Sequence, residues 1–156
     1  MKYSNILVPY DKSESAKHAL VSALQLAAEK EGARVTVYFA APVPEFATGE
    51  FMAASRMSGT VRLTQEDMDR MQQDYVDFER GLLDEDLQGL LGQAQGAVDV
   101  VVGQGKPSKA ILEYAEEMQA DLIVMGCRGL NAVAGMLGSV SYAVLRNANC
   151  PVLVEK

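Results

Sequence analysis

The stretch "DLIVMGCRGLNAVAGMLGSVSYAVL", residues 121–145, decides the fold class of this 156-residue chain. Its first six residues are almost all apolar, which is typical of a buried strand in a parallel sheet. A glycine-rich segment follows, and Gly138 and Ser139 then begin a run with helical character. A strand, a glycine-rich turn and a helix in this order predict a repeating unit of an α/β protein.

The rest of the chain repeats this alternation. The expected strands cover residues 5–10, 33–42, 97–102, 121–126 and 150–156, and the expected helices cover residues 11–32, 64–90, 103–120 and 138–147. Because the strands are almost continuously apolar, we expect a parallel sheet that is covered on both faces. Right-handed crossovers would wind it as an open, doubly wound five-stranded sheet, in one domain over residues 1–156.

The segment between the second strand and the second long helix has no clear period. Residues 43–63 carry prolines and glycines, so we expect a long variable loop with a helical turn near residues 51–55. In the helix that begins at Thr64, one face is apolar, and we expect this face in the core. Its members step by three and four residues: Met68, Met71, Tyr75, Phe78 and Leu82.

The net charge, the length of the apolar runs and the number of cysteines argue against several classes of protein. The net charge is −7, which argues against a broad surface for nucleic acid or for acidic membranes. No apolar run approaches the roughly 18 residues of a membrane helix, so we expect no membrane insertion. The apolar run at the N-terminus is too short for a signal peptide. Two cysteines are too few for a disulfide framework, which favours a cytoplasmic location.

The candidate site lies where the first and fourth strands end. Ligands of doubly wound sheets bind beyond the carboxyl ends of the strands, where the winding reverses. Gly126 and Gly129 can take positive φ and let a ligand approach the backbone. The first N–H groups of the helix that begins at Gly138 favour phosphate, and the hydroxyls of Ser139 and Ser141 can add donors. The alternative is a simple strand-to-helix loop with a serine cap.

Asp11 and Cys127 have two readings each, whereas one reading is expected for His18 and for Lys106. Asp11 either binds a ribose hydroxyl, an adenine amino group or a divalent ion, or it caps the first helix. His18, the only histidine, is expected in a solvated or half-buried role, so no histidine-based metal site or triad is expected. Lys106 belongs to a turn that lacks the Ser or Thr of a Walker motif. Cys127 is either a redox-sensitive thiol or an ordinary loop residue.

Three separated segments resemble the universal stress protein family. They are "ILVPYDKSESAKHAL" (6–20), "ILEYAEEMQADLIVMG" (111–126) and "GSVSYAVLRNANCPVLV" (138–154). The resemblance covers nearly the whole chain except residues 43–95, and it implies a Rossmann-like fold of the adenine nucleotide alpha hydrolase-like type. The nucleotide-binding branch of that family carries Gly-x2-Gly-x9-Gly-Ser/Thr. Here the second gap holds eight residues, 130–137.

The resemblance also implies roles for single residues. Pro9 and Asp11 match positions beside the nucleoside, and Ala40 matches a position whose backbone meets adenine. Residues 125–131 match the loop against ribose and phosphates, and residues 138–140 match the phosphate-binding start of a helix. Tyr10 stands where a small apolar residue is common, and its ring either packs in the core or closes onto the base. The complete expected nucleotide site is Pro9, Tyr10, Asp11, Ala40, Met125, Gly126, Arg128, Gly129, Asn131, Gly138, Ser139, Val140 and Ser141.

The function that follows is a nucleotide-responsive regulatory protein of the stress response. The expected ligand is ATP, or AMP or ADP, with magnesium possible alongside it, and the regulated partner is unknown. The resemblance implies a homodimer through the last strand, residues 151–155, whose edge nothing covers. The alternatives are a slow ATPase or self-phosphorylating enzyme, for which no general base is evident, and a nucleotide-free dimeric adaptor.

Overall fold

The computed structural model describes residues 3–44, 47–59, 63–92, 97–129 and 137–156. Five strands and five helices follow one another along this part of the chain. In chain order they are β1 (Asn5–Pro9), α1 (Glu14–Ala28), β2 (Arg34–Ala41), α2 (Gly49–Ser58), α3 (Gln65–Leu91), β3 (Ala97–Gln104), α4 (Pro107–Glu117), β4 (Leu122–Gly126), α5 (Ser139–Asn147) and β5 (Val152–Glu155).

The five strands form one parallel sheet in the order β3-β2-β1-β4-β5. The chain therefore winds outward from β1 in one direction and then returns to wind in the other. This confirms the expected doubly wound α/β fold. It also places β1 beside β4, so the carboxyl ends of these two strands lie together at the switch point.

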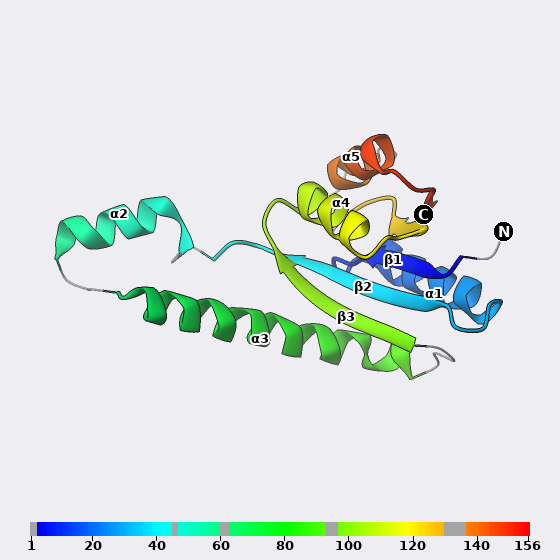
Figure 1. The fold of residues 1–156 in the computed structure, drawn as a ribbon, viewed down its shortest axis with the longest axis horizontal. Coiled ribbons are helices and arrows are strands. Elements are labelled where there is room, and N and C mark those ends of the chain that lie inside the picture. Colours follow the sequence, from blue (N-terminus) through cyan, green and yellow to red (C-terminus); the bar gives the residue numbers. More distant parts are fainter. Residues whose placement is uncertain (1–2, 45–46, 60–62, 93–96, 130–136) are drawn as a thin grey trace.

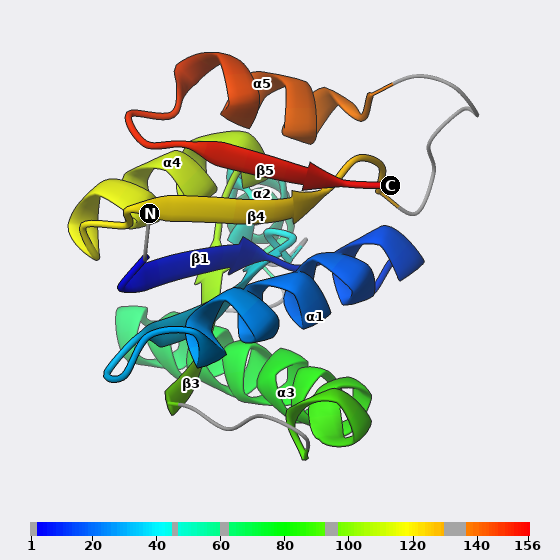
Figure 2. The same cartoon turned by 90° about the vertical axis from the view of Figure 1, so that its right-hand side faces the viewer.

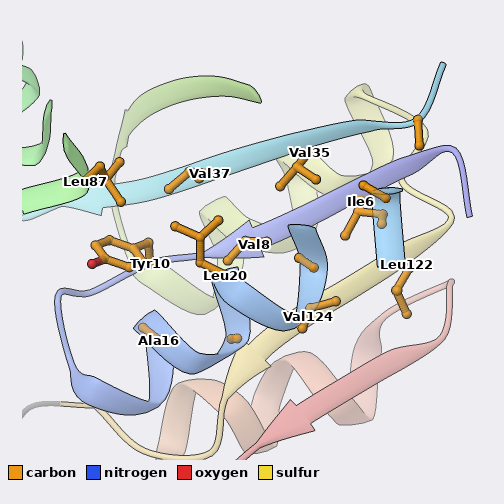
Figure 3. Close-up of a cluster of buried hydrophobic side chains, with 14 of the residues drawn as sticks. Ile6, Val8, Tyr10, Ala16, Leu20, Val35, Val37, Leu87, Leu122 and Val124 are labelled. Atoms are coloured by element: carbon orange, nitrogen blue, oxygen red, sulfur yellow. The ribbon is translucent and has the colours of Figure 1, made fainter. Parts of the chain in front are cut away.

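Helices cover both faces of the sheet (Figure 2). Successive strand residues point to opposite faces, and in β1 both sets are apolar and need to be buried. On one face, Ile6 and Val8 of β1 pack with α1 and with the last part of α3. Figure 3 shows this cluster, in which Leu20 of α1 and Leu87 of α3 approach the same side of the strands. On the other face, Leu7 packs with α4 and α5. Every β1 side chain from Ile6 to Val8 is therefore buried.

Two serine and threonine caps explain where helices begin. The Ser13 side chain accepts a hydrogen bond from the N–H of Ala16 and caps α1. Thr64 and Asp67 form a reciprocal capping box at the start of α3. Both caps satisfy N–H groups that have no partner inside the helix.

The prediction of a loop over residues 43–63 is wrong for its central part. Residues Gly49–Ser58 form the ten-residue helix α2, capped by Thr48 and ended by Gly59, whose φ of 63° is left-handed. The prolines precede this segment, Gly49 is its first residue and Gly59 follows it, so the run between the two glycines is free to be helical. No helix in the described part of the chain is long and apolar enough to cross a membrane.

The prediction that the apolar face of α3 lies in the protein core is also wrong. The buried residues of α3 are Leu83 and Leu87, which lie on a different face, whereas Phe78 is 62% exposed. Met68, Met71 and Tyr75 are half-buried, although α2 and the first part of α3 extend beyond the end of the sheet (Figure 1). Phe78 and Leu82 lie about 140° and 100° around the helix from Leu83, so they point away from the strands on which Leu83 packs.

Candidate functional site

A cavity of about 500 Å³ lies at the carboxyl ends of β1, β2 and β4. This volume is within the range of about 300–1,000 Å³ that is typical of ligand pockets. Its lining residues are Pro9, Tyr10, Asp11, Ala16, Tyr38, Phe39, Ala40, Pro107, Ile111, Met125, Gly126, Arg128, Gly129, Leu137, Gly138, Ser139, Val140 and Ser141. The structure thus brings together every residue of the expected site except Asn131, which lies outside the described residues.

Gly126 and Gly129 allow neighbouring atoms to pack closely, and neither is needed for an unusual backbone angle. Neither has a positive φ, so the expectation of left-handed glycines here is wrong. A Cβ on Gly126 would lie 2.8 Å from the backbone carbon of Ser15, and a Cβ on Gly129 would lie 2.8 Å from Oδ2 of Asp11. These two glycines therefore let the end of β4 pack directly against the start of α1.

The start of α5 is held to the end of β4 by two hydrogen bonds. The N–H of Gly138 donates to the carbonyl of Cys127 (2.8 Å), and the Ser141 hydroxyl donates to the carbonyl of Gly126 (2.9 Å). Ser141 is buried, so its hydroxyl is a structural donor and not the phosphate donor that we expected. Although the second glycine gap is one residue short, these contacts bring Ser139 to the cavity.

Two helices point uncapped N-termini at this cavity. Within the described residues, no side chain caps α4 or α5, whose N-cap residues are Lys106 and Gly138. The first residues of both helices, Pro107 and Ser139, line the cavity. Because the first N–H groups of a helix lack intrahelical partners and carry partial positive charge, the two ends favour an anion.

A hydrogen-bonded group of polar residues holds two residues of the cavity lining, Asp11 and Arg128. Oδ1 of Asp11 accepts from the N–H of Ser13 (3.0 Å) and from its hydroxyl (2.5 Å). The Ser15 hydroxyl donates to the carbonyl of Arg128 (2.7 Å). Ser13, not Asp11, is the cap of α1, so Asp11 fixes the cap residue from outside the helix. Its second oxygen lies beside Gly129.

Aromatic residues at the end of β2 line the cavity. The rings of Tyr38 and Tyr114 stack with 4.7 Å between their centroids, and Gly103 on β3 leaves room for the Tyr38 hydroxyl. The ammonium of Lys12 lies 5.2 Å from the centre of the Phe39 ring. Lys12 itself adopts a left-handed backbone with a φ of 68°. A flat apolar ligand group would find an aromatic surface here.

Tyr10 joins the cavity to α3. Its hydroxyl donates to Oδ2 of Asp86 on α3 (2.6 Å), and the side chain is 3% exposed. Burial, followed by the hydrogen bond to Asp86, raises the pKa of Tyr10 well above its ordinary value. Of the two alternatives for Tyr10, the structure shows packing in the core.

The charged groups at the cavity are few. Arg128 lines it, and among the described residues no carboxylate lies within ion-pair distance of its guanidinium. Lys106 is the cap residue of α4 and does not line the cavity. Over the same described residues, no group of three His, Cys, Asp or Glu side chains gathers as for a metal ion. His18 is exposed and Cys127 is buried.

Sequence reasoning missed six lining residues: Ala16, Tyr38, Phe39, Pro107, Ile111 and Leu137. Part of the signal was present. Tyr38 and Phe39 directly precede Ala40 at the end of the second strand, and Pro107 begins the helix that follows the third strand. In a parallel sheet all of these positions lie at the same edge, so position alone made them candidates.

Comparison with known proteins agrees with this architecture. Residues 2–156 match the sequence profile described as the universal stress protein family. The chain is 34% identical over 156 residues to the "Universal stress protein in QAH/OAS sulfhydrylase 3'region" of Thermus aquaticus, and the match covers 99% of both chains.

Solved structures have the same fold. The universal stress protein UspA from Lactobacillus plantarum superposes with a TM-score of 0.74, at 22% identity, over 100% of this chain and 99% of that one. A universal stress protein solved in complex with cAMP superposes with a TM-score of 0.66, at 25% identity, over 100% and 99% of the two chains.

Proposed function

Because this chain belongs to the universal stress protein family, we propose that its cavity binds an adenine nucleotide, with ATP as the ligand. The observation that carries the proposal is the pair of uncapped helix N-termini, α4 and α5, at one cavity with an aromatic wall. Phosphates suit the N-termini, and a base suits the wall. The structural relative solved with cAMP supports the ligand class.

The proposed orientation follows from where these groups lie. The base packs between the end of β2, at Phe39 and Ala40, and the end of β1. The phosphates meet the N–H groups at Ser139 and Val140, with Arg128 as the neighbouring cation. Magnesium would arrive with the phosphates, and Asp11 is the carboxylate of the cavity that could reach it.

Gly138 offers a sharp test, since a side chain fits there. Its φ is −60°, and an added Cβ would lie 3.4 Å from the nearest atom, which is ordinary contact. In Gly138→Asp the carboxylate caps α5, occupies the N–H groups and repels phosphate. We expect affinity for AMP and ATP to fall at least about tenfold, which is about 1.4 kcal/mol, while the melting temperature does not fall.

Gly138→Ala is the matched control, because it adds the Cβ without a cap or a charge. Its affinity should stay within about threefold of the wild-type value, a difference of less than 1 kcal/mol. Isothermal titration calorimetry with AMP, ADP and ATP, with and without magnesium, measures both variants. The proposal fails if the wild-type protein gives no heat with any of these ligands, or if Gly138→Asp binds as tightly as Gly138→Ala.

We further propose that the protein is a nucleotide-responsive regulatory homodimer that pairs through residues 151–155. In the described sheet β5 pairs with β4 alone, and Tyr142, Leu145 and Leu153 expose apolar side chains nearby on α5 and β5. An open edge with apolar neighbours favours symmetric pairing. The two cysteines, which form no disulfide with each other, favour a cytoplasmic location.

The dimer has its own test. Leu145→Glu places a charge beside the β5 edge and should shift the protein to a monomer in sedimentation velocity. Val43→Glu introduces the same charge at an exposed position after β2, two strands away from β4, and should leave the dimer intact. A wild-type monomer, or equal effects of both variants, would contradict the proposed interface.

A further inference from the structure

Helix α3 has two apolar faces, and the sheet covers only one of them. Leu83 and Leu87 pack on the sheet. Met68, Met71, Tyr75, Phe78 and Leu82 form a second face, called here the α3 stripe. Since each residue turns an α-helix by about 100°, Leu83 lies about 100° from Leu82, and the two faces are separate. Phe78 and Leu82 of the stripe are 62% and 39% exposed, and its other three members are half-buried.

Helix α2 also exposes large apolar side chains. In this helix Phe51 is 43% and Met57 is 89% exposed. Over the described residues α2 packs closely on no other element, and together with the first half of α3 it extends beyond the sheet (Figure 1). Exposed large apolar side chains on neighbouring turns of one helix, such as Phe78 and Leu82, are typical of an interaction surface.

All of the net charge of the protein lies on α3. The helix holds nine of the 21 acidic residues and two of the 14 basic ones, which gives a net charge of −7. The rest of the chain holds 12 residues of each sign and is therefore neutral. The apolar stripe thus belongs to the one strongly acidic element of the molecule.

Carboxylates border the stripe on both sides. Asp74 lies between Met71 and Phe78 at helical spacings of three and four residues, and Glu79 borders the other side in the same way. The two arginines of α3 do not offset them, because Arg70 and Arg80 each pair with a carboxylate one turn away, at 3.2 and 3.7 Å. A cationic partner would therefore meet acidic edges along the stripe.

This charge pattern selects among the possible occupants. A second copy would bring another helix of charge −7 to the same place, and an anionic membrane would also repel it. We propose that the α3 stripe binds a basic amphipathic helical segment of a partner protein. The apolar face of that segment packs on the stripe, and its lysines or arginines meet the bordering carboxylates. The methionines let the surface adapt to the partner.

Two synthetic peptides test this with the full chain, without nucleotide. One is a fluorescent helix of leucines and lysines, about five turns long, with the leucines on one face. The other has the same composition in an order that leaves no apolar face. We expect fluorescence anisotropy to show at least about tenfold tighter binding of the first peptide. If both peptides bind equally, charge alone explains the binding, and the proposal is wrong.

Protein variants locate the contact. Phe78→Glu should weaken binding of the amphipathic peptide at least about tenfold. Asp74→Lys/Glu85→Lys reverses two charges that border the stripe and should do the same. The control Asp69→Lys/Asp77→Lys makes an identical change of net charge on the other sides of α3 and should cost less than about threefold. All four substituted carboxylates are exposed.

Equal losses in the two charge-reversal variants would overturn the proposal, as would no loss in Phe78→Glu. Sedimentation velocity of the same proteins tests the second copy as occupant. If Phe78→Glu dissociates an oligomer and the wild-type protein binds neither peptide, a second copy covers the stripe and the proposal is wrong. Because no nucleotide is present, these results do not depend on whether the cavity binds one.

Discussion

Replacing Gly126 with alanine should destabilise the protein because the new methyl group meets the backbone. A Cβ at this position would lie 2.8 Å from the backbone carbon of Ser15 and 2.9 Å from the backbone nitrogen of Ala16. Neither atom can rotate away, so β4 and α1 must move apart. Overpacking of this kind costs about 1–3 kcal/mol. In a domain of this size 1 kcal/mol corresponds to about 2–4 °C, so we expect a loss of about 6 °C in melting temperature.

Gly81→Ala is the matched control for this measurement. The substitution is the same, but Gly81 lies inside α3 with nothing within 4 Å of an added Cβ. Alanine is favoured over glycine there by about 0.8–1.0 kcal/mol, so the melting temperature should rise. Thermal unfolding followed by circular dichroism compares both variants with the wild type. If Gly126→Ala melts at or above the wild-type temperature, the argument that this glycine is required for close packing is refuted.

Three further substitutions test single contacts. Tyr10→Phe leaves Asp86 without its hydroxyl donor and should cost about 1.5–3 kcal/mol in urea unfolding. The raised pKa of Tyr10 means that the folded state keeps a proton that the unfolded chain loses near its usual pKa of about 10, so wild-type stability should fall above this pH and fall less steeply in Tyr10→Phe. Ser141→Ala should lower stability by about 1 kcal/mol, whereas Ser139→Ala, at an exposed position, should leave it unchanged in the same assay. Asp121→Ala removes the acceptor of two backbone N–H groups at the start of β1, at 2.7 and 3.0 Å, and hydrogen exchange there should accelerate at least about tenfold for a loss near 1.4 kcal/mol.

The fold could be predicted from the sequence because its signals are local and repeated. Each strand is a short apolar run, and the first four are each followed by a helix, with a capping residue such as Ser13 or Thr64 at the start of α1 and α3. Once the strands are parallel, the handedness of the connections leaves few orders for the sheet. The pairing of β1 with β4 then brings Asp11 and Gly126 to one cavity.

The errors arose where the decisive contacts are tertiary. The spacing of Phe78 with its neighbours shows an apolar face but not which side of α3 turns toward the sheet. The sequence shows that Gly126 tolerates any φ, but only the packing of α1 shows that the glycine is needed for space. Likewise, the hydroxyl of Ser141 looks free until the carbonyl of Gly126 is placed beside it.

The charge of α3 affects how the molecule is oriented when it approaches a charged surface. A neutral body attached to one helix of charge −7 is a large electric dipole. An approaching cationic surface therefore exerts a torque on the protein and turns α3 toward itself before any atoms touch. At physiological ionic strength this orientation acts only within about 8 Å, so the salt concentration of the medium sets how often an encounter begins with α3 in front.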